Sequence, residues 1–338
     1  MQRHHHAVRR TLVALAAAAT LVGTAGTLPA AAAARCPAPA VITGHAPTLV
    51  PETAVWDQAH HRFLVGSLRH GTVSAVGLDG SVHTLVDDPG TLIEIAGLRI
   101  DRVHRRILVT NLDNGVGERS GPATLGRVAG IAAYDLDTGR RLYYTDLAAV
   151  AGDGGSHLAN DIALAPDGTA YVTDSFAPVV YRVDPDGTGS VLLRDDRLTA
   201  APGSYGLNGI AYREGRLVLG KWDDGTLWQL PLWDPSALRR VEIADGGALL
   251  HLDGIFGRPD GTIAGVTNAF FGAGRDAEVE LRSDDHWRTA RLTAVHPSAD
   301  ATPTAVTTGP AGALYQLSGG LADANAGHPD DTFVLRRV

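Results

Sequence analysis

Short apolar segments alternate with polar turns along most of this chain. Six stretches can be aligned in one register, and each consists of an apolar strand, a turn and a second apolar strand. They recur at intervals of 44 to 64 residues and begin at Glu52, Ala96, Asn160, Asn208, Asp253 and Thr304. A repeat of this kind predicts a radial all-β architecture, and we expect a six-bladed β-propeller over residues 49–338.

The last repeat is too short to form a complete blade. A blade needs about four strands, but only 34 residues follow Thr304. We therefore expect the segment Val41–Val50 to supply the missing strand and close the ring, which leaves few free sheet edges. A β-sandwich with a similar number of strands is the main alternative, but it does not explain the common register.

The N-terminus has the pattern of an export signal. Three arginines occur among the first ten residues, and an apolar stretch rich in Ala follows over Thr11–Ala34. This predicts a cleaved signal peptide at 1–34, a leader segment at 35–48 and a secreted, extracellular protein. The alternative is a membrane anchor, which the Thr, Gly and Pro content weakens. The sequence leaves open whether export uses the Sec or the twin-arginine route.

The net charge limits which classes of binding partner are expected. Removal of residues 1–34 takes away three arginines and no acid, so the net charge changes from −8 to −11. An acidic protein does not neutralise phosphates, so we expect no nucleic-acid partner. A small-molecule substrate, a monomer without a stable membrane anchor and a bound cation are expected instead. The single cysteine excludes an internal disulfide, so stability must come from the core.

Oxygen-bearing side chains occupy the same position in four of the six repeats: Glu52, Asn160, Asn208 and Asp253. In a propeller the first strand of each repeat lies at the axis, so these side chains are expected to meet. Asn208-Gly209 and Asp253-Gly254 are also typical hairpin turns. Each is followed at once by an apolar strand, however, and the glycine can let that strand approach the channel axis closely.

The aligned residues are typical ligands of a hard cation. Two carboxylates and two amide carbonyls suit calcium, which takes six to eight oxygens and would keep places for water and substrate. Zinc would favour His or Cys, and neither occurs at the aligned positions. We therefore predict Ca²⁺ bound by Glu52, Asn160, Asn208 and Asp253, with another divalent cation as the alternative.

Four sequence runs resemble the motifs of the senescence-marker-protein/gluconolactonase/luciferin-regenerating-enzyme superfamily. They occur in the family's order within residues 40–338 and are Pro51–Asp57 (PETAVWD), Asn160-Asp161, Leu207–Ile210 (LNGI) and Leu252–Ile255 (LDGI). The resemblance implies a six-bladed propeller with a divalent cation, usually calcium, at the channel mouth. Members of the superfamily open lactones, and similar propellers hydrolyse phosphoesters.

Carried across residue by residue, the resemblance assigns Glu52, Asn208 and Asp253 as core ligands. It assigns Asn160 as a residue that contacts the ion or the substrate. Sugar lactonases commonly have an arginine two residues before that Asn, and this chain has Leu158 there. The departure favours a less polar substrate than a sugar lactone.

Three residues are candidates for catalysis. The counterpart of Asp253 is proposed as a base in similar enzymes, and His251 and His157 lie on loops that are expected to enter the same mouth. A neutral imidazole there can take a proton near pH 7. Ordinary loop or surface histidines are the alternative for both. Asp161 either positions a ligand or pairs within its blade.

Other catalytic signatures do not occur in the sequence. It contains no G-x-S-x-G, no H-E-x-x-H and no phosphate-binding loop. Trp222, Trp228 and Trp233 are expected to pack within their blade. The sequence therefore predicts an exported calcium-dependent hydrolase of a lactone or ester. The alternatives are a bond-forming propeller enzyme resembling strictosidine synthase and a non-catalytic binding protein resembling the yellow and royal-jelly proteins.

Overall fold

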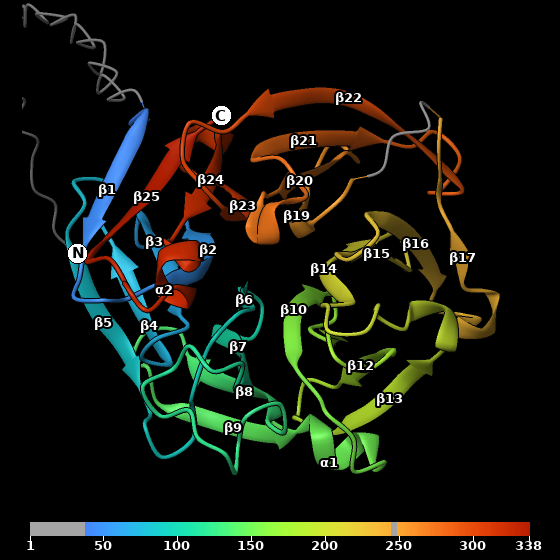
Figure 1. The fold of residues 1–338 in the computed structure, drawn as a ribbon, viewed down its shortest axis with the longest axis horizontal. Helices are drawn as coiled ribbons and strands as arrows, with labels where there is room; N and C mark the ends of the chain where they lie inside the picture. The colour runs from blue at the N-terminus through green and yellow to red at the C-terminus, as the bar shows by residue number, and fades with distance from the viewer. Residues whose placement is uncertain (1–37, 245–248) are drawn as a thin grey trace, which may run out of the picture. The chain divides into compact units, whose positions relative to one another are not determined.

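Six sheets stand around a common axis in the unit Ala38–Val338, and this confirms the predicted six-bladed propeller (Figure 1). The computed structural model describes residues 38–244 and 249–338. The predicted signal peptide and residues 35–37 lie outside the described residues. Within the described ranges, no helix has the length and apolar character to cross a membrane.

The first three blades each consist of four consecutive antiparallel strands. Blade 1 contains β2 (Pro51–Asp57), β3 (Arg62–Ser67), β4 (Thr72–Val76) and β5 (Val82–Asp87). Blade 2 contains β6 (Leu98–Asp101), β7 (Arg106–Leu112), β8 (Ala129–Asp135) and β9 (Arg141–Asp146). Blade 3 contains β10 (Ala159–Leu164), β11 (Ala170–Asp174), β12 (Val179–Val183) and β13 (Gly189–Arg194).

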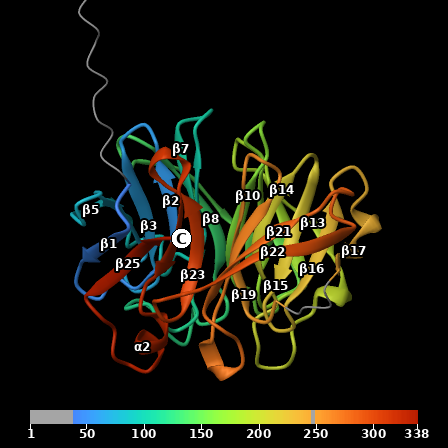
Figure 2. The ribbon, with the colours of Figure 1, turned by 90° about the horizontal axis from the view of Figure 1, so that it is seen from above.

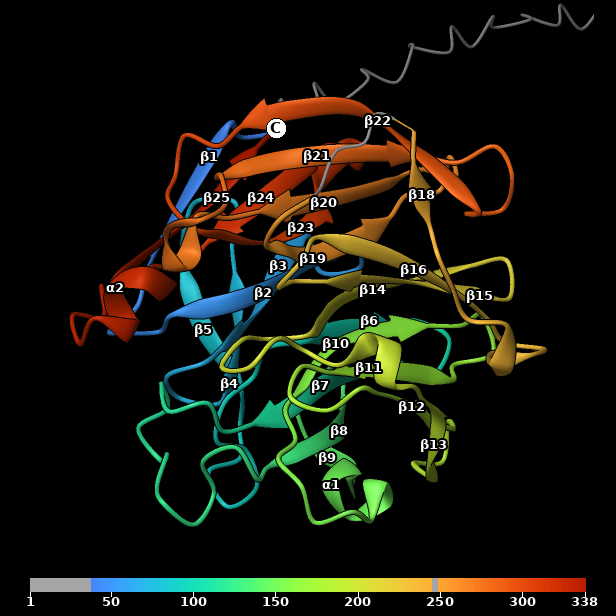
Figure 3. The ribbon, with the colours of Figure 1, turned by 45° about the vertical axis from the view of Figure 1, so that its right-hand side comes forward.

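The other three blades depart from this plan at their outer edges. Blade 4 contains β14 (Leu207–Arg213), β15 (Arg216–Lys221), β16 (Thr226–Pro231) and β17 (Arg239–Arg240). Blade 5 contains β19 (Leu252–Gly257), β20 (Ile263–Thr267), β21 (Ala277–Arg282), β22 (Thr289–Pro297) and the short β18 (Glu242–Ile243). Strand β18 pairs in parallel with β22 on the outside of the blade (Figure 3).

Blade 6 joins the two ends of the unit. It contains β23 (Pro303–Thr308), β24 (Leu314–Ser318), β25 (Thr332–Arg337) and β1 (Val41–His45). Strand β1 pairs antiparallel with β25, from Val41 opposite Arg336 to His45 opposite Thr332. The predicted closing strand is therefore confirmed, and it lies inside the segment 35–48 that was expected to be a leader.

Helices are short and lie in the connections. They are α1 (Leu147–Ala151), α2 (Leu321–Asn325), and the 3₁₀ turns η1 (Asp196–Leu198), η2 (Pro235–Ala237), η3 (Phe270–Gly272) and η4 (Pro310–Gly312). Helix α2 lies at one end of the propeller (Figure 2). Residues of α2 and η3 line the cleft described below, so both belong to the same mouth of the axial channel.

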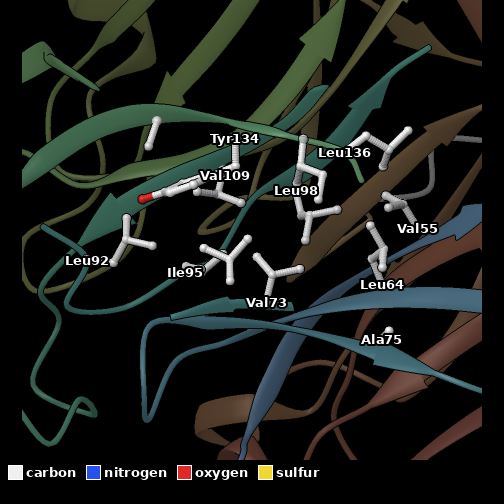
Figure 4. Close-up of a cluster of buried hydrophobic side chains, with 13 residues drawn as sticks. Val55, Leu64, Val73, Ala75, Leu92, Ile95, Leu98, Val109, Tyr134 and Leu136 are labelled. Atoms are coloured by element: carbon white, nitrogen blue, oxygen red, sulfur yellow. The ribbon is translucent and has the colours of Figure 1, made fainter. Parts of the chain in front are cut away.

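The hydrophobic core is a set of layers between neighbouring blades. The layer between blades 1 and 2 contains Leu64 and Val73 from one blade and Leu98 and Val109 from the other, all fully buried (Figure 4). The inner strands also contact one another around the ring, for example β2 with both β6 and β23. This packing holds the start of every inner strand at the axis.

Local sequence explains the turns that follow the inner strands. In blade 1, Asp57 accepts a hydrogen bond from His60 Nδ1 at 2.6 Å and one from Arg62 Nε at 3.2 Å. In blade 2, Asp101 accepts the same two bonds from His104 and Arg106, at 2.8 and 3.0 Å. Blades 3 and 5 have a Pro-Asp-Gly turn instead, with glycine at positive φ as this turn requires.

Candidate functional site

The aligned positions of the six repeats converge on the propeller axis. A cleft with about 480 Å³ of empty space, part of it open to solvent, is lined by all four predicted ligands, Glu52, Asn160, Asn208 and Asp253. An adjoining channel of about 300 Å³ shares three of them and is also lined by Thr304 of the last repeat. Residues spread over two hundred positions therefore line one continuous site.

β-Bulges occur at these positions. The register of the inner strand shifts at Pro51/Thr53, Ala159/Ile162, Leu207/Ile210, Leu252/Ile255 and Pro303/Ala305. A bulge adds an unpaired residue and redirects a side chain, so five of the six inner strands begin with the same device. The predicted ligands lie inside these shifts and belong to strands; they are not hairpin turns.

Glycine after the ligand permits close approach of neighbouring blades. A Cβ on Gly209 would collide with the backbone of Asp253 and Ile255, and one on Gly254 would lie 2.7 Å from the carbonyl oxygen of Thr304. Neither glycine has a positive φ. The absence of a side chain is therefore required by crowding at the axis, as the sequence predicted.

Hydroxyl groups of neighbouring blades fix the backbone of the site. Thr304 Oγ1 donates to the carbonyl oxygen of Glu52 at 2.7 Å, and Thr173 Oγ1 donates to that of Asn208 at 2.6 Å. Thr110 Oγ1 donates in the same way to Asn160 at 2.9 Å. These bonds cross from one blade to the next, so they set the position of one ligand relative to another.

Asp253 has one carboxylate oxygen without a partner. Asn268 Nδ2 donates to Oδ2 at 2.6 Å, whereas Oδ1 is buried and accepts no hydrogen bond. Burial raises the pKa of Asp253 to about 7, and the charge of Asp161 adds to the rise, against the lowering by Asn268 and Asn208. The side chain of Asn208 lies close enough to the Asp253 carboxylate to lower its pKa. It does not form a hydrogen bond of normal geometry with Oδ1.

The acidic groups of the site repel one another. Burial raises the pKa of Glu52 well above its usual range, and the charges of Asp253 and Asp161 raise it further. Asp161 itself is paired with Arg99, whose Nη2 lies 2.9 and 3.0 Å from the two carboxylate oxygens. Arg99 therefore offsets part of the negative charge from the channel side, whereas among the described residues Glu52 and Asp253 form no ion pair with a basic side chain.

These groups fit a divalent cation. All the candidate donors are oxygens, and one buried carboxylate oxygen, Oδ1 of Asp253, has no hydrogen-bond partner. The pKa values of both acids, Glu52 and Asp253, are raised, as expected where two acids lack the counter-charge that a cation would supply. Asn160 Nδ2 donates to Ser175 Oγ at 2.9 Å, so its amide oxygen is directed away from Ser175. In the described ranges, no group of three or more His, Cys, Asp or Glu forms a metal cluster, and the predicted set relies on two asparagines.

His251 lies behind the wall of the cleft. Its ring stacks on Trp222 with parallel planes and 3.8 Å between centroids, and its Nδ1 lies 3.2 Å from the carbonyl oxygen of Asn268. Burial lowers the pKa of His251, so the ring is neutral near pH 7. Trp222 and not His251 lines the cleft. His251 thus supports a wall residue and the backbone beside Asp253.

His157 is not brought to the cleft. Its Nδ1 lies 2.7 Å from Asp174 Oδ2, its Nε2 lies 2.8 Å from Asp153 Oδ1, and the side chain is buried. The hydrogen bonds and charges of these two aspartates raise the pKa of His157. Both ring nitrogens are engaged and His157 does not line the cleft; the expected proton transfer by His157 stays a prediction.

The wall of the cleft is mostly apolar. Leu68, Leu112, Leu158 and Leu321 come from blades 1, 2, 3 and from α2, and Phe270 is added by η3. The polar residues on the wall are Asn114, Asn325 and Tyr205. Leu158, at the position where the resemblance implies an arginine, is therefore part of a larger apolar lining.

Sequence reasoning missed Asn268, Arg99 and the aromatic wall. Asn268 directly follows β20, and the second strand of blade 2 contains Asn111 in the same V-T-N run. The equivalent positions of Asn111 and Asn268 at the end of the second strand of their repeats could have indicated Asn268. Trp222 was expected to pack within blade 4, and it forms part of the cleft. The loops that carry Tyr205 and Phe270 show no pattern that identifies them.

No family model matches the sequence, and a search of curated proteins found no match. Solved structures share the fold. The allergen Mala s 1 of Malassezia sympodialis has a TM-score of 0.70 at 18% identity, and the match covers 88% of this chain and 96% of that one.

A gluconolactonase from Xanthomonas campestris has a TM-score of 0.55 at 19% identity, with 87% of each chain covered. A luciferin-regenerating enzyme has a TM-score of 0.58 at 12% identity, with 88% of this chain and 95% of that chain covered. These neighbours support the resemblance to the superfamily at the level of the fold. Their low identities do not transfer an activity.

Proposed function

We propose that this protein is an exported, calcium-dependent hydrolase of a lactone or ester. The observation that carries the proposal is the unpartnered Oδ1 of Asp253, a residue that lines the cleft together with Glu52, Asn160 and Asn208. Lactonase-like propellers among the structural neighbours agree with it. Secretion, a monomeric state and calcium as the physiological ion belong to the same proposal.

The four predicted ligands would hold the cation through their side-chain oxygens. When bound, the cation supplies Lewis acidity toward a carbonyl oxygen and a fixed place for water. The protein contributes a rigid oxygen array, because interblade bonds from Thr304, Thr173 and Thr110 fix the ligand backbones. The leucines around the mouth exclude bulk water from the reacting group, which strengthens the electrostatic interactions there.

Asp253 is the residue placed to move a proton. Its Oδ2 is held by Asn268, so Oδ1 is the available oxygen; one of its lone pairs would go to the ion and the other can accept a proton from water. The water oxygen then bonds to the carbonyl carbon, the ring C–O bond breaks, and the released alkoxide takes the proton. Burial raises the pKa of Asp253 to about 7, and a bound cation would lower it, so that the carboxylate is ionised and can accept a proton near neutral pH.

The test combines turnover with calcium binding. We expect the purified full chain to hydrolyse δ-valerolactone or an aryl acetate, to lose activity in chelator and to regain it with calcium. Asp253→Asn and Glu52→Gln should each lower calcium affinity in calorimetry by at least tenfold and remove turnover. Asp284→Asn and Glu214→Gln change the same side chains at exposed positions and serve as matched controls.

Activity that survives both chelation and Asp253→Asn would overturn the proposal. Calcium binding and ligand-induced thermal shifts without any turnover would also overturn it, and would favour a non-catalytic binding protein.

A further inference from the structure

The structure points to the substrate class of this cleft. We infer that it selects uncharged lactones or esters with a flat apolar group, and that this group extends past Tyr205 into a second hollow. We call that hollow the aromatic annex; it is bounded by Phe176, Phe271, Tyr205 and the loop 199–204. The inference rests on the proposed function for the reaction, but the binding of the apolar group can be tested without it.

The composition of the cleft excludes charged and polyhydroxylated substrates. Glu52 and Asp253 are the charged side chains that line it, and both are acidic. On the wall, Tyr205 donates to Asn114 Oδ1 at 3.3 Å, so these two polar groups satisfy each other. Those hydroxyls of a sugar lactone that face Leu68, Leu112, Leu158 or Leu321 would stay without partners, which costs affinity.

Tyr205 connects the cleft and the annex. It lines both hollows, and its ring is nearly parallel to those of Phe176 and Phe271, at 16° and 6°. The centroids are 5.8 and 6.4 Å away. The annex contains about 930 Å³ of empty space, part of it open to solvent, and its lining residues carry no charge. A flat apolar group that extends past Tyr205 would lie against these aromatic faces.

The rings of Phe176 and Phe271 are exposed to solvent, and packing of the core does not require this exposure. Phe176 is 37% exposed and Phe271 is 67% exposed. Apolar rings left open at the rim of a cleft are typical of ligand-binding surfaces. A substrate ring that covers them would remove this surface from water.

The backbone at η3 is an independent sign of function. Phe271 has a φ of 61°, in the left-handed region that a bulky residue rarely adopts. Phe270 lines the cleft while Phe271 lines the annex, so two consecutive residues send one ring to each hollow. Ten other non-glycine residues of the described ranges also have a positive φ, so the conformation of Phe271 agrees with a binding role but does not by itself establish one.

The first experiment compares δ-valerolactone with its phenyl derivative, 6-phenyloxan-2-one. Both open to an alkoxide from the same six-membered ring, so their ratio of kcat/KM reports mainly on the phenyl group. We expect the phenyl compound to be preferred at least tenfold, and δ-gluconolactone to be the poorest substrate. Phe271→Ala and Phe176→Ala should each lower the preference about three- to tenfold. Trp233→Ala removes an exposed ring outside both hollows and should leave the preference unchanged.

The second experiment does not depend on turnover. The lactams 2-piperidone and 6-phenyl-2-piperidone resist hydrolysis, and their binding is measured by quenching of tryptophan fluorescence. Tighter binding of the phenyl lactam that weakens in Phe271→Ala supports the annex, even if no lactone is hydrolysed and the proposed function fails. Equal binding of the two lactams, or a preference untouched by both Phe variants, would overturn the inference.

Discussion

Asn268 Nδ2 donates to Oδ2 of Asp253 at 2.6 Å, and this bond leaves Oδ1 as the carboxylate oxygen without a partner. Asp253 lies at the start of β19, and Asn268 directly follows the adjacent strand β20. A neutral amide that orients a ligand carboxylate sets how that carboxylate presents itself to an ion. Asn268 is therefore a positioning residue of the proposed calcium site.

Replacement of Asn268 by Ala should weaken calcium binding. Asp253 would lose its orienting bond, and outer partners of this kind typically contribute 10- to 100-fold in affinity. Isothermal calorimetry on the full chain measures the change. Gln316→Ala is a matched control, because it removes a buried amide that donates to Ser298 outside the site. Equal affinity in Asn268→Ala and the parent protein would disprove the positioning role.

Glu52→Gln should stabilise the calcium-free protein and remove its response to calcium. The charges of Asp253 and Asp161 act against an ionised Glu52, so a neutral amide relieves repulsion. In the parent protein, calcium at a hundredfold excess over its Kd should add about 2.7 kcal/mol to the free energy of unfolding. Thermal unfolding with calcium and with chelator measures both effects, and the two proteins should exchange their order of stability.

Glu214→Gln, at an exposed position, is the control for that exchange. If Glu52→Gln lowers the stability of the chelated protein, the repulsion argument fails.

The common register was sufficient to predict the ring and the meeting of its inner strands. Period, turn residues and strand length are local properties, and they repeat in every blade. The register also placed Glu52, Asn160, Asn208 and Asp253 on one site, because equivalent positions of a propeller share one height along the axis. Their role as ligands of an ion stays a prediction.

Other features depend on contacts that the register does not contain. His157 lies on the loop that leads into blade 3, as expected, but its ring is bound by Asp174 and Asp153 and does not line the cleft. Arg99 reaches Asp161 across 62 positions of sequence, and no local pattern announces that pair. The side chains of irregular loops, such as Tyr205, are placed by tertiary packing. The sequence therefore predicted which backbone positions meet at the site, but it did not predict which side chains surround them.

The Arg99–Asp161 pair should be strongly coupled. Arg99→Met leaves the buried Asp161 carboxylate without its partner, and we expect a loss of about 3 kcal/mol in the free energy of unfolding. Asp161→Asn in the same protein should recover part of this loss, because the amide oxygen can still accept from the backbone N–H of Ile162. Urea unfolding of the two single variants and the double variant measures the coupling.

The exposed pair Arg282–Asp284 provides the comparison. Its side chains are both 55% exposed, and Arg282→Met should cost less than about 1 kcal/mol. Additive effects of Arg99→Met and Asp161→Asn would contradict the pairing.

Gly44 should be essential for closure of the ring. It lies in β1 opposite Phe333 of β25, and a Cβ at this position would collide with the Phe333 ring. Gly44→Ala should therefore destabilise the protein by about 1–3 kcal/mol, the range typical of overpacking. Thermal unfolding measures the loss, which Phe333→Leu in the same protein should partly restore. Thr43→Ala, exposed on the same strand, should change little, and equal stability of the two β1 variants would refute the steric argument.

Glu278 should make stability fall as the pH rises. Its side chain is fully buried in β21 and neither carboxylate oxygen has a hydrogen-bond partner, although His296 Nε2 lies 3.9 Å from Oε2. Burial followed by the charge of Glu280 raises the pKa of Glu278 to about 7, against the lowering by Arg258. The native state then binds the proton more tightly than the unfolded chain, whose pKa is near the usual 4.5. The contribution of Glu278 is present in full below pH 4.5 and is lost as the pH rises through 7.

The size of this loss follows from the shift of the pKa. At 1.36 kcal/mol per unit, it amounts to about 3 kcal/mol between pH 4.5 and pH 7.5. Glu278→Gln removes this titration. As the pH rises over this range, the parent should therefore lose stability relative to the variant, and the free energy of unfolding of the variant minus that of the parent should increase. Urea unfolding at pH 5 and pH 8 isolates the effect from the other buried acids, which titrate in both proteins. Glu242→Gln, exposed in β18, should show no such growth; if Glu278→Gln behaves in the same way, the buried carboxyl group has a partner in solution.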